Sequence, residues 1–396
     1  MLTDYKDALQ ITLNQSFNWG EERVPLAAAG GRILAETLCT DRPQPPYDRV
    51  TMDGIAIDYR GYAAGRRVFP VAGVVAAGAV PAPLNDGDAC LEVMTGAVLP
   101  PGATTVIRYE DLERTDAGFH LPDGVPDAKN IHRKGSDAAQ GEKLIGPGAV
   151  INGAAINLLA GCGYAEVLVR KLPRVAVIAT GDELVGVGEQ PAPHQIRMSN
   201  LYHLRHQLAT AGIAATTHHL ADDRAALRAA IGALLTDHDV LIFSGGVSKG
   251  KYDFLPEVLA DLGVRKLFHR VAQRPGKPIW VGRTEETMVF GLPGNPVSSL
   301  TGMLAYVGPF LRRKLGLTHE AQFRELAKEV SFGKDLTLFQ IVSVDPITQK
   351  VRPVSNAGSG DASSLLRADG LLILPRDRST FPAGEAFPYI PFDKIL

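Results

Sequence analysis

Apolar and polar positions follow two different patterns along the chain, and the change comes near residue 173. Beyond it, short apolar runs alternate with segments in which apolar residues recur every three or four positions. The short apolar runs predict strands at 175–178, 213–220, 239–243, 266–271 and 287–290. The segments with three- or four-residue spacing predict helices at 200–211, 223–235, 254–262 and 296–314. This alternation is typical of a parallel, doubly wound α/β sheet.

The N-terminal segment carries a helical pattern. Leu9, Leu13 and Phe17 recur at intervals of four, so residues 1–39 are predicted to be helical. A proline-rich run at 41–48 ends this pattern, because proline interrupts a helix interior.

Strand-like patterns dominate elsewhere. Short apolar runs between glycines and prolines predict a β-rich region after residue 40, and period-two runs predict a small β barrel after residue 318. Directly after the β-rich region, residues 142–172 predict a short helix and one strand. The predicted fold class is therefore a multidomain α/β protein. Its expected domains are a mixed linking domain (1–39 and 142–172), a β-rich domain (40–141), a doubly wound domain (173–317) and a C-terminal β barrel (318–396).

Composition narrows the classes of function. The 396 residues are 45% hydrophobic, and 41 basic residues nearly balance 43 acidic ones, which argues against a general nucleic-acid binder. Three widely spaced cysteines form no disulfide or zinc pattern, and the N-terminus lacks an apolar signal core. Prolines interrupt the most apolar stretch, residues 68–84, which predicts no membrane span. We therefore expect a cytoplasmic protein that binds neither nucleic acid nor membrane.

Candidate chemistry follows three predicted strands, at 179–184, 244–253 and 292–299. In a doubly wound sheet, ligands bind at the carboxyl ends of the strands. Gly245-Gly246 is suited to presenting backbone amides to an anion, although a plain tight turn explains the pair as well. Asn295 and Pro296 fit the cap and first residue of a helix, whose first turn would bind an oxyanion or simply begin the helix.

Charged residues near these loops predict two kinds of site. Glu183, Asp222 and Asp253 offer only oxygen ligands, which suits Mg²⁺ beside phosphates, although both aspartates could instead be helix caps. Arg270, Arg274 and Lys277 surround a tight turn, where they could bind an anion or form a solvated charged turn. Arg270 and Arg274 are an even number apart and could share one strand face.

Three motifs carry a resemblance to a known family. They are Ser244-Gly-Gly-Val-Ser-Lys-Gly-Lys-Tyr-Asp253, Pro275-Gly-Lys-Pro278 and Gly291-Leu-Pro-Gly-Asn-Pro-Val-Ser298. With further segments in the same order over nearly the whole chain, they resemble the molybdopterin molybdenumtransferase family, of the MoeA and gephyrin E-domain type.

The resemblance implies an activity and its partners. It implies insertion of molybdenum from molybdate into adenylylated molybdopterin, with release of AMP and with Mg²⁺ present, by a homodimer whose doubly wound domain is MogA-like. The cleft would lie between the doubly wound domain of one subunit and the β domain of the other. Molybdopterin adenylyltransferase and molybdoenzyme maturation factors are the other partners that it suggests.

The same resemblance assigns roles to individual residues. The catalytic carboxylates it implies are Asp53, Asp137, Glu183 and Asp253. The metal ligands it implies are Glu183, Asp222 and Asp253. The substrate-binding residues it implies are Thr95, Ser248, Arg270, Arg274, Lys277, Pro293, Gly294, Asn295, Pro296, Ser298 and Ser359.

Several positions depart from the family pattern. Arginines stand at 270 and 274, where lysines are common in bacterial members, and arginine holds an oxyanion bidentately. The other departures are Thr51, Ile55, Met198, Lys249 and Lys251. They leave two alternatives open, a non-catalytic cofactor-binding or scaffold paralogue and an insertase that prefers tungstate.

Overall fold

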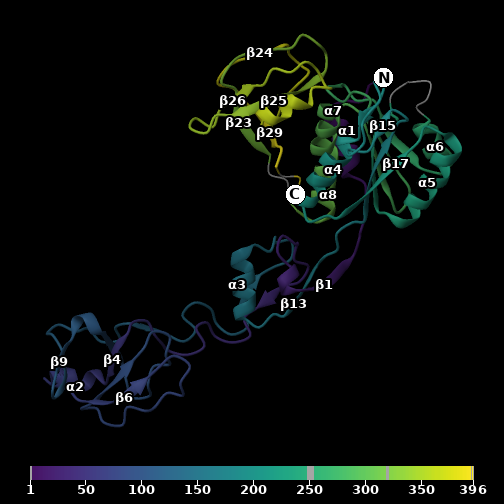
Figure 1. Cartoon of the computed structure of the whole chain (residues 1–396). Coiled ribbons are helices and arrows are strands. Elements are labelled where there is room, and N and C mark those ends of the chain that lie inside the picture. The colour runs from purple at the N-terminus through teal and green to yellow at the C-terminus, as the bar shows by residue number, and fades with distance from the viewer. Residues whose placement is uncertain (1, 248–253, 318–320, 394, 396) are drawn as a thin grey trace. The chain divides into compact units, whose positions relative to one another are not determined.

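A computed structural model describes residues 2–247, 254–317, 321–393 and 395. The chain divides into two compact units, which Figure 1 labels by their helices and strands. The larger unit contains residues 1–35, 148–152 and 167–396, and the smaller contains 36–147 and 153–166.

A six-stranded mixed sheet forms the centre of the larger unit. Its strands, in spatial order, are β17 (Ala215–Leu220), β14 (Val175–Thr180), β18 (Val240–Ser244), β22 (Met288–Leu292), β21 (Trp280–Arg283) and β19 (Arg265–His269). The first four run parallel, but β21 runs antiparallel to both of its neighbours. The prediction of a wholly parallel sheet is therefore wrong at this edge. Only residues 284–287 join β21 to β22, a connection too short for a parallel crossover.

Helices cover both faces of this sheet. They are α4 (Ser199–Thr210) and α7 (Pro296–Gly302) on one face and α5 (Arg224–Asp237) and α6 (Leu255–Asp261) on the other. Alternate residues of β14 point to opposite faces, so that Val177 packs with the first pair and Ile178 with the second. The doubly wound arrangement is confirmed.

The long helix predicted at 296–314 is also present. It consists of α7, a π-helical turn η3 (Met303–Val307) and α8 (Gly308–Lys314). Every residue of the π-helical turn is buried.

The N-terminal segment differs from its prediction. Helix α1 (Tyr5–Leu13) ends at Leu13, and strand β1 (Glu21–Pro25), a 3₁₀ turn η1 (Leu26–Ala28) and strand β2 (Leu38–Cys39) follow. The apolar spacing continues past the helix because Phe17 packs edge-on against Phe310, with ring centroids 5.6 Å apart. Strand β1 pairs with β13 (Glu166–Arg170).

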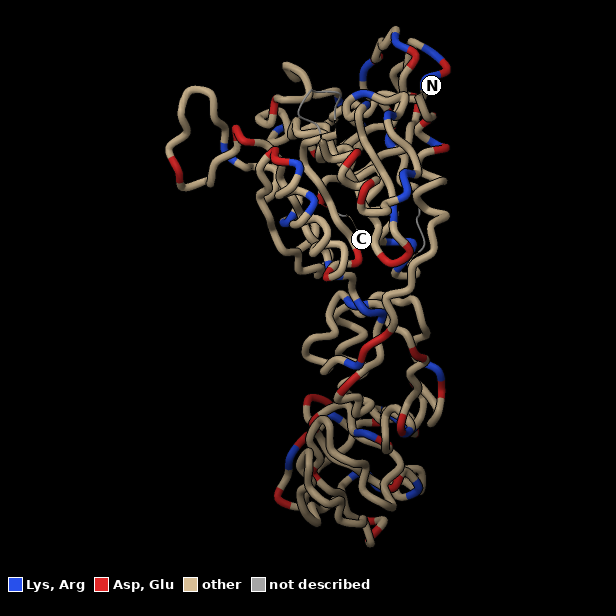
Figure 2. Tube along the Cα trace, turned by 90° about the vertical axis from the view of Figure 1, so that its right-hand side faces the viewer, with Lys and Arg blue, Asp and Glu red and all other residues tan. Residues whose placement is uncertain are grey.

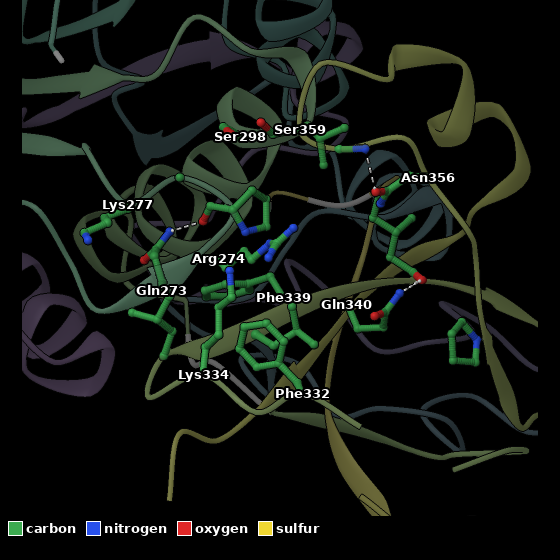
Figure 3. A pocket seen from close by; sticks show the side chains of 18 of the residues that line it. Gln273, Arg274, Lys277, Ser298, Phe332, Lys334, Phe339, Gln340, Asn356 and Ser359 are labelled. Atoms are coloured by element: carbon green, nitrogen blue, oxygen red, sulfur yellow. Dashed lines mark hydrogen bonds between the residues drawn. The ribbon is translucent and has the colours of Figure 1, made fainter. Parts of the chain in front are cut away.

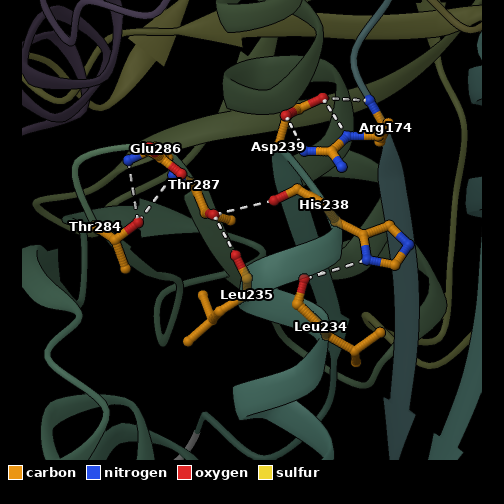
Figure 4. A network of polar contacts seen from close by, with 8 residues as sticks. All are labelled: Arg174, Leu234, Leu235, His238, Asp239, Thr284, Glu286 and Thr287. Carbon is orange, nitrogen blue, oxygen red and sulfur yellow. Dashed lines mark hydrogen bonds and ion pairs between the residues drawn. The ribbon is translucent and has the colours of Figure 1, made fainter.

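Polar contacts fix the amino ends of three central strands (Figure 4). Arg174, just before β14, donates its backbone amide and its guanidinium to Asp239, just before β18, at 2.7 and 2.9 Å. The hydroxyl of Thr287, just before β22, donates to the carbonyls of Leu235 and His238, each at 3.0 Å. This end of the sheet is therefore closed by satisfied polar groups.

A second six-stranded sheet occupies the C-terminal part of the larger unit. Its strands, in spatial order, are β20 (Gln273–Arg274), β25 (Thr337–Val344), β27 (Gly370–Leu374), β29 (Ala386–Pro391) and β23 (Gln322–Glu325), and β26 (Val351–Pro353) pairs with β25. Strand β20 precedes β21 of the central sheet in the chain but pairs with β25, so the two sheets are connected by backbone. Shorter elements complete the unit: β15 (Leu184–Val185) with β16 (Ile196–Arg197), β24 (Val330–Ser331) with β28 (Thr380–Phe381), and the 3₁₀ helix η4 (Ala362–Arg367).

The smaller unit is rich in strands, as the sequence predicts. Its main sheet contains β6 (Val71–Val75), β7 (Cys90–Val93), β4 (Gly54–Ile57) and β8 (Thr105–Arg108). A second sheet contains β5 (Val68–Phe69), β10 (Gly118–His120) and β9 (Glu113–Thr115). Two pairs, β11 (Ile131–His132) with β3 (Arg49–Val50) and β12 (Lys143–Ile145) with β2, and the helical segments α2 (Tyr59–Ala63), η2 (Tyr109–Asp111) and α3 (Gly153–Gly161), complete it.

Charged residues of both signs are interspersed in each unit, as Figure 2 shows. This distribution agrees with the near balance of acidic and basic residues in the sequence. Within the described ranges, every helix is too short or too polar to cross a membrane.

The core of the central sheet generates a stability prediction. Phe290 of β22 is fully buried and packs against the ring of Phe310 at 5.6 Å. We expect Phe290→Ala to lower the free energy of unfolding by about 3–5 kcal/mol, because it leaves a cavity in a packed core. Phe323→Ala, at a position that is 56% exposed, is the matched control. Equal urea midpoints for the two variants would contradict the packing described.

Candidate active site

Two adjoining cavities lie at the carboxyl ends of the central strands. The first, the carboxylate cavity, has a volume of about 570 Å³ and is lined by both Glu183 and Asp222. Its wall includes the ends of β14, β18 and β22 with the loops that follow them, from Thr180, Ser244 and Pro293 onward. The structure thus places three of the loops singled out in the sequence, as far as they are described, around one space.

Glu183 is held by the tight loop after β14. A Cβ at position 181 would lie 2.5 Å from a carboxylate oxygen of Glu183, so this close approach requires Gly181. The carbonyl of Gly181 in turn accepts a hydrogen bond at 2.9 Å from Nε2 of His219 on β17. His219 therefore helps to fix the loop that carries Glu183, and nothing in the sequence pattern indicated this contact.

The structure separates the two neighbouring aspartates. Asp223 is the N-cap of α5 and accepts a hydrogen bond from the amide of Ala226 at 2.8 Å. Asp222 lines the carboxylate cavity, and its amide donates to Asp182 at 3.1 Å. The helix-cap alternative therefore applies to Asp223 and not to Asp222.

Part of the predicted metal and substrate set cannot be placed. Ser248, Lys249, Lys251 and Asp253 lie outside the described residues. Among the residues that are described, no three His, Cys, Asp or Glu side chains converge to hold a metal ion.

The Gly245-Gly246 pair has the conformation expected of it. Both residues have positive φ, 107° and 69°, and a Cβ at 246 would lie 2.8 Å from the hydroxyl of Thr180. The amide of Gly245 already donates to the carbonyl of Leu292 at 2.9 Å. The pair therefore presents fewer amides to a ligand than the sequence suggested.

Asn200 connects two of the loops around the carboxylate cavity. From the first turn of α4, its Nδ2 donates to the hydroxyl of Ser244 at 2.9 Å and to the carbonyl of Gly294 at 2.7 Å. It lines the cavity itself. Sequence reasoning missed this residue, because an Asn near a helix start is usually a cap.

The second cavity, of about 850 Å³, is lined by four cations and by no described carboxylate. We call it the cationic cavity. Figure 3 labels three of the cations, Arg274, Lys277 and Lys334. Arg274 is the last residue of β20 and Lys277 lies in the turn between β20 and β21, while Lys328 and Lys334 come from the C-terminal part of the unit. No described residue forms an ion pair with any of the four. A cavity of this charge suits an anion with several oxygens.

The Pro-Gly-Asn-Pro loop lies between the two cavities. Pro278, Pro293 and Asn295 line both. Gly294 and Pro296 line the carboxylate cavity. Ser298 lines the cationic cavity.

Ser359 forms hydrogen bonds with residues at the start of α7. Its carbonyl accepts the amide of Val297 at 3.1 Å, and its hydroxyl accepts Nδ2 of Asn295 at 2.9 Å. The side chain of Asn295 makes no capping bond to the helix. Of the two alternatives that the sequence left open here, the amide of Val297 agrees with a plain helix start, because a loop of the C-terminal part already accepts its hydrogen bond. Ser359 itself lines the cationic cavity.

Arg270 is placed apart from the other cations. It lines neither cavity, and its backbone turns with φ 70°. Strand β19 ends at His269 and β20 begins at Gln273, so Arg270 and Arg274 do not share a strand face as predicted. The physical reason is the left-handed turn between the two strands.

Asp53 and Asp137, in the smaller unit, each accept defined hydrogen bonds. Asp53 accepts from the amide and the hydroxyl of Thr95 at 2.6 and 2.8 Å, and these bonds, the amide first, hold the pKa of Asp53 below its usual value. Asp137 lies 2.7 Å from Nε2 of His132, whose hydrogen bond lowers the pKa of Asp137. Both carboxylates are therefore kept ionised and oriented.

Comparison with known proteins identifies relatives of the whole chain. Residues 3–163 match the MoeA N-terminal region (domain I and II), residues 176–313 a probable molybdopterin binding domain, and residues 324–392 the MoeA C-terminal region (domain IV). A protein of Synechocystis sp. named molybdopterin molybdenumtransferase is 39% identical over 380 residues, which cover 94% of this chain and 95% of the relative. One from Staphylococcus epidermidis with the same name is 30% identical, over 96% and 93% of the two chains. The crystal structure of a molybdopterin biosynthesis MoeA protein from Pyrococcus horikoshii has a TM-score of 0.82 and 29% identity, and it covers 99% of each chain.

The contacts of Asp53 generate a prediction about its titration. Thr95→Val removes one of two donors, so the pKa of Asp53 should rise toward its ordinary value, as carboxyl NMR would show. Because the folded pKa is depressed, the carboxylate stabilises the fold above its unfolded pKa, and this stability disappears as the pH falls through the folded pKa. In the variant this stabilisation should be smaller, and its loss should be complete at a higher pH, because only the folded pKa has risen. Thr115→Val, which removes a hydroxyl that donates to Gly118, is the control, and an unchanged Asp53 pKa in Thr95→Val would contradict the assignment.

Proposed function

We propose that this chain, which belongs to the MoeA family of molybdopterin molybdenumtransferases, inserts molybdenum from molybdate into adenylylated molybdopterin and releases AMP. The reaction is a late step of molybdenum cofactor biosynthesis. The named relatives and the MoeA fold support this step, and the release of AMP is the finer part of the proposal.

One observation carries the proposal: a cavity with two carboxylates adjoins a cavity with four cations. The proposed substrates are a tetrahedral dianion and a pterin joined to AMP through a pyrophosphate. The cationic cavity provides donors for anionic oxygens, and the carboxylate cavity suits the metal-bound side of the pyrophosphate.

The carboxylate cavity fits Mg²⁺. Mg²⁺ is commonly held by one or two carboxylates together with substrate phosphates, and Glu183 and Asp222 provide two carboxylates here. When bound, Mg²⁺ would neutralise charge on the phosphoryl oxygens as AMP leaves.

The chain's own residues bind and orient the reactants. Arg274 holds an oxyanion with a fixed planar array of donors, while Lys277, Lys328 and Lys334 add charge around it. These cations are in place before the reaction, so little reorganisation is needed when charge develops on the phosphoryl oxygens. Asn200 holds the Pro-Gly-Asn-Pro loop at the junction of the two cavities.

The smaller unit also takes part in this proposal. Asp53, Thr95 and Asp137 are the residues that the family resemblance assigns to the reaction, and their hydrogen bonds keep both carboxylates ionised. We propose a homodimer in which these residues serve the reaction at the partner's cavities.

We also propose a cytoplasmic location. The three cysteines are unpaired, which agrees with a reducing compartment. There the chain would receive its substrate from a molybdopterin adenylyltransferase and deliver product to molybdoenzyme maturation factors.

The neighbouring aspartates provide a matched test of the reaction. We expect Glu183→Gln and Asp222→Asn to slow AMP release about 100-fold, because each removes a negative charge from the carboxylate cavity. Asp223→Asn should retain full activity, since Asn caps a helix nearly as well as Asp. AMP would be quantified by chromatography after mixing with adenylylated molybdopterin, molybdate and Mg²⁺. No AMP from the folded wild-type protein would refute the proposed function.

Mixing two inactive variants tests the homodimer. Glu183→Gln affects the larger unit and Asp53→Asn the smaller one. If each site uses residues of both subunits, co-expression should restore about a quarter of the sites, because half of the dimers are mixed and each mixed dimer has one intact site. Mixed dimers without recovered activity would contradict shared sites.

A further inference from the structure

We propose that Tyr306 is a positioning residue for the cationic cavity and that it acts through Gln273. Tyr306 lies on the π-helical turn η3 and is fully buried, and it lines neither the cationic nor the carboxylate cavity. The inference rests on the proposed function, because it concerns the cavity assigned to the oxyanion.

Two hydrogen bonds connect the core to the turn that carries two of the four cations. The hydroxyl of Tyr306 donates to Oε1 of Gln273, and Nε2 of Gln273 donates to the carbonyl of Pro275 at 3.0 Å. Gln273 is only 1% exposed. We call these two hydrogen bonds the bridge. Pro275 stands between Arg274 and Lys277 in the chain, so the bridge ends between these two cations, which Figure 3 labels together with Gln273.

The bridge is held on both sides. The ring of Tyr306 packs against the rings of Tyr5 and Phe268, with centroids 5.9 and 6.0 Å away. At the turn, a Cβ on residue 276 would lie 2.9 Å from Nε2 of Gln273, so Gly276 leaves the space that the amide occupies. π-Helical turns are rare and are frequent at functional sites, and this one places a polar hydroxyl inside an apolar core.

The electrostatics explain why such a bridge matters. Arg274 and Lys277 flank the residue that the bridge holds, and no described carboxylate lines the cavity that they share with Lys328 and Lys334. The hydrogen bond of Tyr306 to Gln273 is buried, and that of Gln273 to Pro275 is partly buried, and together they orient this turn. Without the hydroxyl, the Gln273 amide loses one partner that fixes its orientation, and the turn loses one of its restraints.

The test measures oxyanion binding directly. Molybdate would be titrated calorimetrically into the full-length protein, without pterin and without turnover. Tyr306→Phe should raise the Kd for molybdate about tenfold, as expected for one net hydrogen bond. Tyr389→Phe removes a hydroxyl that donates to the Asp369 carbonyl at 2.9 Å in the same unit, outside the cationic cavity, and should leave this Kd unchanged.

A double-mutant cycle separates positioning from a general loss of stability. In a Gln273→Leu background, Tyr306→Phe should cause no further weakening, because the bridge is already broken. Wild-type affinity in Tyr306→Phe, or an undiminished effect in the Gln273→Leu background, would overturn the inference while leaving the proposed function intact. A wild-type protein that binds no molybdate would refute the assigned oxyanion site and this inference with it.

Discussion

Four cations in one cavity, for which no described residue forms an ion pair, are the constraint on which this site depends. Like charges gathered in one space need an anion or a rigid scaffold to hold them. Here the scaffold comes from two sheets, because Arg274 lies on β20 beside β25, while Lys328 and Lys334 belong to the C-terminal part. Cations held in advance by two sheets are the property expected of a site prepared for oxyanions.

The two ends of the central sheet show how stability and function are divided. At the amino ends, Arg174, Asp239 and Thr287 satisfy one another and the neighbouring carbonyls. At the carboxyl end of β14 and in α7, the hydroxyls of Thr180 and Ser299 are buried and have no hydrogen-bond partner among the described residues. Buried polar groups usually find partners, and exceptions gather where a protein has sacrificed stability for function. Thr180 lines the carboxylate cavity, so its hydroxyl lies where a ligand would bind.

Much of this fold was predictable because buried strands such as 175–178 and 239–243 are apolar on both faces. The short strands β20 and β21 were missed, since a two- or four-residue strand beside a proline-rich turn has no periodicity to detect. Aspartate is common at helix caps, so the sequence could not show which of Asp222 and Asp223 caps α5. The path of the backbone decides this, and it places Asp223 at the cap. Lys328 and Lys334 were missed because, in sequence, isolated lysines resemble ordinary surface residues. The roles of Asp53 and Asp137 came from the family resemblance and stay predictions.

The C-terminal sheet takes one edge strand, β20, from a segment that lies before the central strand β21 in the chain. The backbone of Gln273 and Arg274 pairs with Thr337 and Leu338, although these segments are far apart in the chain. A gene fragment for the C-terminal sheet would therefore express a module with an exposed, unpaired edge, which is prone to aggregation. Recombination that exchanged this module between homologues would also have to preserve the β20–β25 register.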